Sequence, residues 1–354
     1  MMKNTGFGRL MGKRIWTVLL FILLLTGIAG CGEQKAQEDH RIRIVCTIFP
    51  EYDWVKQILG GLAEEAELTL LMKNGADLHS YQPTVWDMKA ISEADLFLYV
   101  GGESDFWVEE ALANTDNSDC RVLNLMEILK DSVKTEEHVE GMQTAGDHEH
   151  RPEAEDQSIH EGGTPDAHEE EEEYDEHLWL SLRNAQSVCD AVTEELGRLD
   201  AGHRDIYEQN NRLYQEKLHA LDMEYKKAVE QSSMPVLLFG DRFPFRYLAE
   251  DYGITYYAAF AGCAAETEAS FETVVFLAEK AGELNLPAVM KIDGSDGAIA
   301  RTIAGNTKTG DQKVLLLDSM QSVSSQDIEN GESYLSIMER NLEVLKEALP
   351  AADG

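Results

Sequence analysis

The sequence predicts an α/β fold of two Rossmann-like βα lobes joined by a long rigid helix. Short apolar, β-branched runs alternate with amphipathic segments near both ends of the chain, which is typical of parallel βαβ units with right-handed crossovers. Between them, apolar and aromatic residues recur at helical spacing over 204–231, as on one buried face of a helix. At 1.5 Å per residue this helix would be about 40 Å long, enough to span a whole lobe.

The N-terminal lobe is expected to cover 41–183. Its first strand is placed at 42–49, because IRIVCTIF is rich in β-branched residues and Pro50 closes it. Later strands and helices alternate along the lobe. The expected strands lie at 68–72, 96–100 and 121–125, and the expected helices at 52–59, 84–93 and 106–113.

Two helices, at 184–198 and 204–231, form a connector over 184–232, after which the βα alternation resumes. The C-terminal lobe is expected to cover 233–354. Its expected strands lie at 235–239, 256–260, 288–292 and 314–317, and its expected helices at 245–252, 270–283, 297–305 and 333–349.

The N-terminus has the pattern of an export signal. Four basic residues precede the apolar run 15–29, and this run is shorter than the about 20 residues that a membrane-spanning helix needs. It ends in Ile-Ala-Gly-Cys, which resembles a bacterial lipobox. We therefore expect a signal peptide over 1–30, lipidation of Cys31, a polar tether over 31–40 and an extracytoplasmic protein anchored to the cell membrane. The alternative is an ordinary signal peptide with a coincidental cysteine.

Charge and cysteine content narrow the class of partner. With 66 acidic and 30 basic residues, the chain should be repelled by nucleic acid and by anionic lipid, so its natural small partner is a cation. The remaining cysteines form no CxxC pair and therefore indicate neither a zinc ribbon nor a redox motif. The sequence leaves disulfide pairing open among Cys46, Cys120, Cys189 and Cys263.

The stretch 138–176 combines histidines with a dense field of carboxylates. It has almost no apolar residues between Ala145 and Tyr174, so we expect a disordered, solvated loop. Imidazoles are common zinc ligands, and the acidic field concentrates cations. We predict an accessory metal-binding role for its histidines, the alternative being an acidic solubilising loop with chance histidines. They are His138, His148, His150, His160 and His168.

Four short motifs follow strands or precede helices, where open α/β sheets bind ligands. A single histidine in such a place is weak evidence for a site, and the motifs gain weight only together. They are GADLHSYQPT at 75–84, DEHLWLS at 175–181, GDRFPFRY at 240–247 and LDS at 317–319.

Together these motifs resemble the substrate-binding lipoproteins of bacterial zinc and manganese ABC importers (cluster A-I), most of all the binding protein of the high-affinity zinc uptake system. GADLHSYQPT is similar to that family's GxDPHxYxPT motif, and HLWLSLRNA to its HxWLSPxNA motif. Zinc-specific members insert an acidic, histidine-rich loop at the same place. The resemblance covers nearly the whole chain after the signal peptide and implies a metal site in the interlobe cleft.

The resemblance also implies three metal ligands. His79 and His177 match the two ligand histidines of the family's N-terminal lobe, and Asp318 matches the aspartate of its C-terminal lobe. Two imidazoles with one or two carboxylates suit a tetrahedral zinc shell or a slightly expanded manganese shell.

The family's remaining ligand is harder to place, because GDRFPF carries no histidine where one is expected. Direct counting lands on Arg242, which cannot bind a cation. A shift of one residue lands on Asp241, which we predict as the ligand. Asp241 could instead pair with Arg242 or Arg246 or cap the next helix. Cys263 and Glu266 are the alternative donors.

We therefore expect a monomeric receptor that captures Zn²⁺ and delivers it to the membrane permease of an ABC importer, whose ATPase is cytoplasmic. A manganese or iron receptor of the same fold is the nearest alternative: the missing histidine favours manganese, whereas the histidine-rich loop favours zinc. A metal-binding surface adhesin is a further alternative. An enzyme is not expected, because the chain has no HExxH, GxSxG or GxxxxGK[ST] motif.

Overall fold

The computed structural model describes residues 41–73, 75–115, 117–143, 173–264 and 268–351. The chain divides into two compact units, Met1–Arg41 and Ile42–Gly354, and every element below belongs to the second. Within the described residues, no helix is both long and apolar enough to cross a membrane. Several predictions concern residues outside these ranges: the signal peptide, the tether, Cys31, His148, His150, His160, His168 and Glu266.

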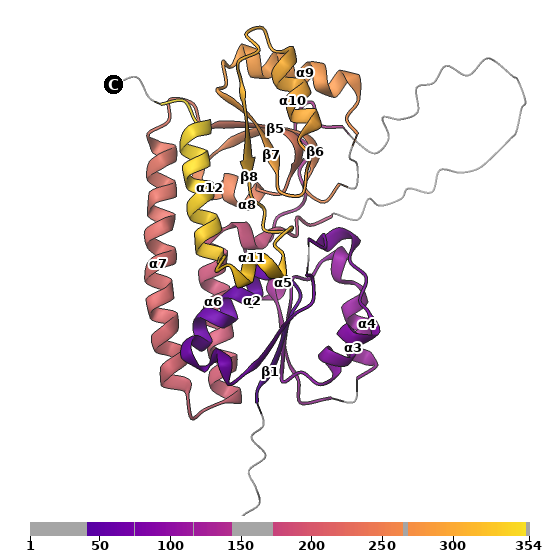
Figure 1. Cartoon of the computed structure of the whole chain (residues 1–354), viewed down its shortest axis with the longest axis vertical. Helices are drawn as coiled ribbons and strands as arrows, with labels where there is room; N and C mark the ends of the chain where they lie inside the picture. The colour runs from indigo at the N-terminus through magenta and orange to yellow at the C-terminus, as the bar shows by residue number, and fades with distance from the viewer. Residues whose placement is uncertain (1–40, 74, 116, 144–172, 265–267, 352–354) are drawn as a thin grey trace, which may run out of the picture. The chain divides into compact units, whose positions relative to one another are not determined.

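The N-terminal lobe is built on a parallel sheet of order β2-β1-β3-β4 (Figure 1). The order places later strands on both sides of β1, so helices are needed on both faces as crossovers. The strands are β1 (Arg43–Cys46), β2 (Glu67–Leu70), β3 (Leu96–Tyr99) and β4 (Arg121–Asn124), and the helices are α2 (Phe49–Leu59), α3 (Val85–Ser92), α4 (Trp107–Ala113) and α5 (Leu125–Ile128).

The C-terminal lobe repeats this plan with the parallel order β6-β5-β7-β8. Its longest strand, β5, carries a register shift against β6 between Phe239 and Arg242. The strands are β5 (Val236–Phe243), β6 (Thr255–Ala261), β7 (Ala288–Ile292) and β8 (Lys313–Leu317), and the helices are α8 (Arg246–Tyr252), α9 (Phe271–Glu283), α10 (Ala298–Asn306), α11 (Ser325–Glu329) and α12 (Tyr334–Ala348). The prediction of two parallel βα lobes is confirmed.

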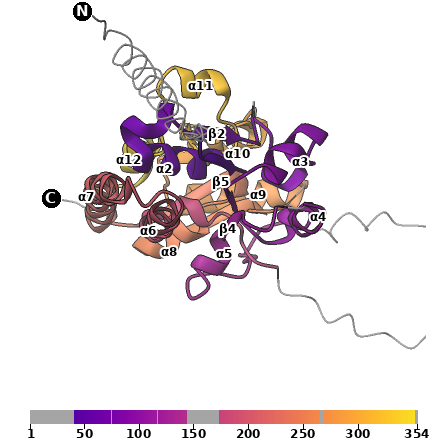
Figure 2. The same ribbon diagram turned by 90° about the horizontal axis from the view of Figure 1, so that it is seen from below.

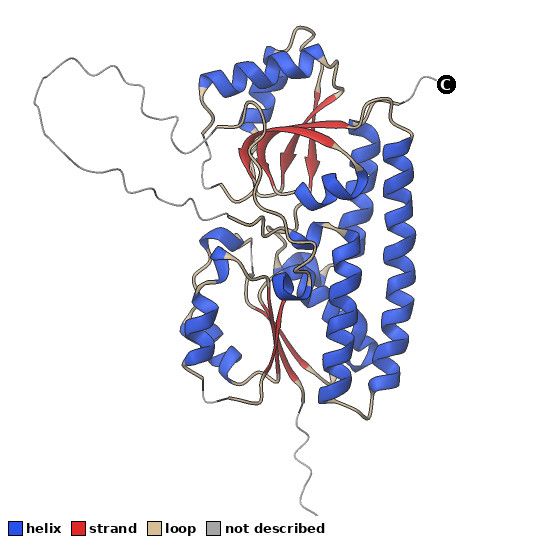
Figure 3. Cartoon of the chain, turned by 180° about the vertical axis from the view of Figure 1, so that it is seen from behind, coloured by secondary structure: helices blue, strands red, loops and turns tan. Residues whose placement is uncertain are grey.

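Two long helices, α6 (Leu182–Leu199) and α7 (Arg204–Glu230), form the connector. Figure 2 shows them end-on at one side of the molecule, with α3 and α4 at the opposite side, and Figure 3 shows the longer helix passing both sheets. From α7, Asn210 donates a hydrogen bond to the carbonyl of Ile58 (2.9 Å), and Tyr225 donates one to the carbonyl of Met338 (2.6 Å). Helix α7 is thus fastened to both lobes.

The two lobes also share one hydrophobic core, which includes buried residues of α2, α6, α7 and α12. Tyr334 of α12 stacks edge-on against Trp54 of α2, with ring centroids 5.1 Å apart. Its hydroxyl donates to the carbonyl of Trp179 (2.8 Å) and its backbone N–H to Asp53 (2.9 Å). These contacts are fully buried, so breaking them would be costly, and motion between the lobes should be small.

Both ends of the stretch 138–176 differ from the expected solvated loop. Backbone pairing explains one end, where Thr135 and Tyr174 form an antiparallel bridge. At the other end, Gln143 is buried, its backbone N–H donates to Ala259 (3.0 Å) and its side chain accepts from the N–H of Ser270 (2.6 Å). The sequence does not predict these backbone and side-chain hydrogen bonds, because the acidic composition of the stretch indicates a solvated loop.

Candidate metal centre

His79 lies on a short 3₁₀ helix (Leu78–Ser80) in the loop that follows β2. Asp77 caps this helix by accepting the His79 backbone N–H at 3.0 Å. The imidazole Nδ1 lies 2.9 Å from the hydroxyl of Ser104 and 3.3 Å from a carboxylate oxygen of Glu176. Because the Ser104 hydroxyl donates to Glu176, it can accept the Nδ1 proton of His79. This network leaves Nε2 of His79 as the free ligand atom.

His177 is fully buried at the start of a second 3₁₀ helix (Leu178–Leu180). One oxygen of Asp175 accepts its backbone N–H at 2.9 Å and lies 3.0 Å from its Nδ1. A carboxylate is acceptor-only, so Nδ1 carries the proton and Nε2 carries the lone pair. Trp179 packs against the ring, with centroids 5.2 Å apart. Buried ligand histidines are commonly oriented by a carboxylate in this way.

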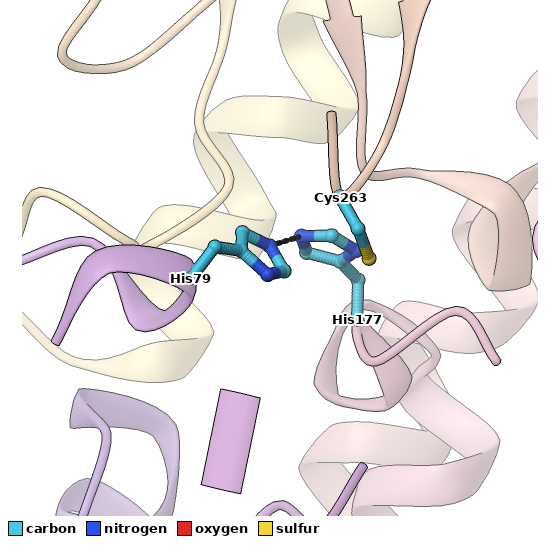
Figure 4. Close-up of side chains that lie close together, drawn as sticks. All are labelled: His79, His177 and Cys263. Atoms are coloured by element: carbon cyan, nitrogen blue, oxygen red, sulfur yellow. Dashed lines mark hydrogen bonds between the residues drawn. The ribbon is translucent and has the colours of Figure 1, made fainter. Parts of the chain in front are cut away.

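The two imidazoles turn their Nε2 atoms toward each other at 3.2 Å (Figure 4). Two lone pairs at this distance repel unless a proton or a cation lies between them. Zinc–nitrogen bonds of about 2.0–2.1 Å at the tetrahedral angle would separate two ligand nitrogens by about 3.3–3.4 Å. The observed spacing is therefore close to that of two histidines on one zinc ion.

Cys263 joins the two histidines from the loop after β6 (Figure 4). One ligand atom from each of the three residues lies within 4.8 Å of the others. The Cys263 backbone N–H donates to Glu136 at 2.7 Å, which fixes the loop. Burial, and after it the nearby Asp175 and Glu136 carboxylates, raise the pKa of the thiol well above its usual value. The sequence had indicated Cys263 only as an alternative donor.

Arg242 lies where the resemblance places the family's remaining ligand. Its guanidinium donates to Asp77 at 2.7 Å, an ion pair between β5 of one lobe and the His79 loop of the other. Burial acts to raise the pKa of Asp77, but the hydrogen bond and charge of Arg242 outweigh it and hold this pKa below its usual value. The positively charged guanidinium of Arg242 thus stands where the family has a metal ligand, and it neutralises the Asp77 carboxylate beside the site.

Asp241 lines a cavity of about 670 Å³ together with His79, Arg242 and Asp293. Its Oδ1 accepts the backbone N–H of Arg242 at 3.0 Å. Its Oδ2 is buried and has no hydrogen-bond partner among the described residues. The structure therefore places Asp241 beside the candidate site, but not within the group formed by the two histidines and Cys263.

Asp318 follows β8 and is bound locally. Its carboxylate accepts the N–H of Met320 at 2.8 Å, and Arg340 lies 3.8 Å from its other oxygen. Burial and the neighbouring Asp293 raise the pKa of Asp318 to about 6. Asp318 likewise lies outside the group of three ligand atoms, and its role as a ligand stays a prediction.

His138, the one described member of the predicted accessory set, has an exposed side chain. All four described non-lipobox cysteines are unpaired, so the structure contains no disulfide among them. Sequence reasoning missed Asp175 and Ser104, which orient the two ligand histidines. The adjacent DEH motif could have indicated Asp175, but nothing in the sequence links Ser104 to His79.

Two parallel βα lobes, a connecting helix fastened to both and a ligand cluster supplied by both define a two-lobed solute-binding protein that is suited to a metal ion. Residues 44–348 match the model of the family described as zinc-uptake complex component A, periplasmic, and the chain belongs to that family.

Sequence relatives have matching descriptions. The chain is 27% identical over 334 residues to the zinc-binding lipoprotein AdcA of Streptococcus pneumoniae serotype 4, covering 94% of this chain but 60% of AdcA. It is 25% identical over 340 residues to the high-affinity zinc uptake system protein ZnuA of Bacillus subtilis, covering 94% of this chain and 98% of ZnuA. The chain therefore spans less than two thirds of the streptococcal relative.

Solved structures show the same fold. The Zn(II)-bound ZnuA-like domain of Streptococcus pneumoniae AdcA aligns with a TM-score of 0.64 and 23% identity, covering 88% of this chain and 99% of that domain. The metal-dependent lipoprotein YcdH of Bacillus subtilis aligns with a TM-score of 0.66 and 23% identity, covering 87% of this chain and all of that one (100%). A mutant laminin-binding adhesin (Lmb) of Streptococcus agalactiae also aligns, with a TM-score of 0.66 and 23% identity over 87% of this chain and 99% of the adhesin chain.

Proposed function

We propose that this protein is the extracytoplasmic zinc receptor of an ABC importer, which captures Zn²⁺ between its lobes and delivers it to the permease. The observation that carries the proposal is the pair of Nε2 atoms of His79 and His177, 3.2 Å apart, with each ring fixed at Nδ1. The family description and the zinc-binding relatives support zinc as the cargo.

The site favours binding over catalysis. His177 is fully buried, and the side chain of His79 is 13% exposed. A transported ion needs a shell that closes around it, whereas a catalytic zinc keeps an open position for water or substrate. Ligands from both lobes would make bound metal favour the closed arrangement, and the fastened helix α7 would limit that change to a small tilt.

The remaining predictions complete this proposal. The signal peptide at 1–30 and lipid on Cys31 would hold the receptor at the outer face of the membrane, near a permease driven by a cytoplasmic ATPase. Relatives named lipoproteins support this location. Asp241 and Asp318 stay candidate carboxylate ligands. Oδ2 of Asp241 has no hydrogen-bond partner among the described residues, whereas Oδ1 of Asp318 accepts the N–H of Met320. The divisions at 183/184 and 232/233 between the N-terminal lobe, the connector and the C-terminal lobe belong to the same proposal.

The decisive experiment measures zinc affinity in the chain with residues 144–172 replaced by a short Gly-Ser linker. This deletion removes four loop histidines but keeps Gln143 and Asp175, which anchor the flanking segments. We expect one tightly bound Zn²⁺ per chain in this variant. His177→Ala should abolish it, whereas His203→Ala, at the partly buried residue just before α7, should not. Loss of all tight binding on loop deletion alone would refute an interlobe site.

A surface adhesin is a second candidate, because one structural neighbour is a laminin-binding adhesin. Receptor and adhesin roles separate in a binding assay that compares permease-containing vesicles with immobilised laminin. Zinc-dependent binding to the permease alone supports the receptor, and binding to laminin alone supports the adhesin.

A further inference from the structure

We propose that the Cys263 thiolate is the third protein ligand of the cargo metal, and that this sulfur makes the site selective for thiophilic cations such as Zn²⁺ and Cd²⁺ over Mn²⁺. The inference rests on the proposed receptor function and names the donor that the C-terminal lobe contributes. It differs from the carboxylate donors that the resemblance implies.

The first support is geometric. The Cys263 Sγ and one ring nitrogen from each of His79 and His177 lie within 4.8 Å of one another. Zinc–sulfur and zinc–nitrogen bonds of about 2.3 and 2.0–2.1 Å at the tetrahedral angle require a sulfur–nitrogen distance of about 3.5–3.6 Å. A sulfur–nitrogen separation of up to 4.8 Å would therefore have to shorten by about 1.3 Å at most for the atoms to share one ion.

The second support is that the backbone already holds Cys263 in place. Its N–H is bound by Glu136 at 2.7 Å. At Gly262, an added Cβ would lie 2.9 Å from the carbonyl oxygen of Phe243 and 3.2 Å from the His177 ring, so the loop backbone runs directly against that imidazole. This backbone holds the thiol beside the two histidines, whereas Oδ1 of Asp318 accepts the N–H of Met320.

The third support comes from the neighbouring strand. Arg242 on β5 pairs in register with Phe260 on β6, three residues before Cys263, so the two loops share one edge of the sheet. The guanidinium has no lone pair and is held by Asp77. Arg242 thus cannot supply a metal ligand at its own position. Cys263, in the loop after the adjacent strand, can supply one.

A sulfur donor changes which metals the site prefers. Thiolate and imidazole suit zinc and other thiophilic ions, whereas manganese prefers carboxylate, carbonyl and water oxygens. On binding, a metal–sulfur bond forms, the S–H bond breaks, and the proton leaves to solvent. The site would therefore discriminate against manganese even though it lacks the family's remaining histidine.

Cobalt substitution tests the ligand directly, because a thiolate bound to Co²⁺ gives a near-ultraviolet charge-transfer band that imidazole and carboxylate do not give. The metal-free full chain is titrated with Co²⁺ in wild type, Cys263→Ser and the matched control Cys120→Ser, whose cysteine lies away from the site on the loop before β4. We expect the band in wild type and control and its loss in Cys263→Ser. Zinc affinity in Cys263→Ser should fall by about 100-fold, the upper end of the loss that follows removal of a partner that only orients a ligand.

A second variant guards against a folding defect. Cys263→His restores a nitrogen donor, so we expect zinc affinity within about 10-fold of wild type but no thiolate band. A band that persists in Cys263→Ser overturns the proposal. The proposal is also overturned if wild type binds cobalt without the thiolate band and His177→Ala does not bind cobalt. In that case the receptor function stands. If neither Co²⁺ nor Zn²⁺ binding depends on His177, both proposals fail.

Competition tests the selectivity. Wild-type protein loaded with Zn²⁺ should keep it against about a hundredfold excess of Mn²⁺, and Cys263→Asp should narrow this preference. Equal retention of zinc and manganese by the wild type would overturn the inferred selectivity.

Discussion

Asp175 offers a quantitative test of how the site is built. One of its oxygens accepts the backbone N–H of His177 at 2.9 Å and contacts the Nδ1 of the same residue at 3.0 Å. Asp175→Ala removes the carboxylate oxygen that accepts both the backbone N–H and the Nδ1–H of the fully buried His177. Without that oxygen, Nε2 is no longer fixed as the ring nitrogen that carries the lone pair. Loss of such an orienting partner typically lowers metal affinity about 10- to 100-fold, which corresponds to about 1.4–2.8 kcal/mol.

The assay is zinc competition against a fluorescent chelator, with Asp190→Asn on the exposed face of α6 as the control. The same variant leaves two buried N–H groups without acceptors, which should lower the free energy of unfolding of the metal-free protein by about 1–3 kcal/mol. Unchanged zinc affinity in Asp175→Ala, together with lost binding in His177→Ala, would refute the orienting role of Asp175.

Three further predictions concern the surroundings of the site. Arg242→Gln breaks the partly exposed pair with Asp77 and should cost about 1 kcal/mol of unfolding free energy in urea; no change would show that the pair contributes nothing to stability. Burial raises the pKa of Glu51 to about 8. The folded state therefore binds this proton more tightly than the unfolded state, and stability should fall as pH rises from about 5 to 8. Glu51→Gln should flatten that decline in urea titrations at several pH values, and an unchanged slope would contradict it. Gly262→Ala should lower thermal stability and zinc affinity, because a Cβ would meet a backbone carbonyl and the buried imidazole, at a cost of about 1–3 kcal/mol. Gly305→Ala, with open space around it, should be neutral or stabilising.

The fold could be predicted largely because its periodic signals are local. Helix α7 was predicted to within one residue at its C-terminal end, since one face repeats apolar residues over its length. The sequence predicts that strand β5 ends at Phe239 and that the GDRFPFRY motif forms the loop after it. The strand continues to Phe243 through a register shift, with Gly240 packed against the backbone of Ala300. No local pattern encodes that close approach.

The candidate site was predictable only where a motif carried it. His79 and His177 lie in motifs that mark their role, and the structure brings them together. The nearness of Cys263 depends on how β5 pairs with β6 and on how the following loop packs against the imidazole, which are long-range features. Asp318 has the residue type of a metal ligand and follows a strand end. Its carboxylate, however, accepts a hydrogen bond from the backbone N–H of Met320. A sequence pattern cannot show that competition.

The central claim is that a zinc ion binds between the lobes through His79 and His177. The most direct test is the metal-edge X-ray absorption spectrum of protein purified from its own cell surface, because it identifies the ion and counts its donors together. The account predicts zinc with at least two imidazole nitrogens at about 2.0–2.1 Å and one sulfur at about 2.3 Å. A manganese edge with an all-oxygen shell, or zinc without imidazole donors, would contradict it.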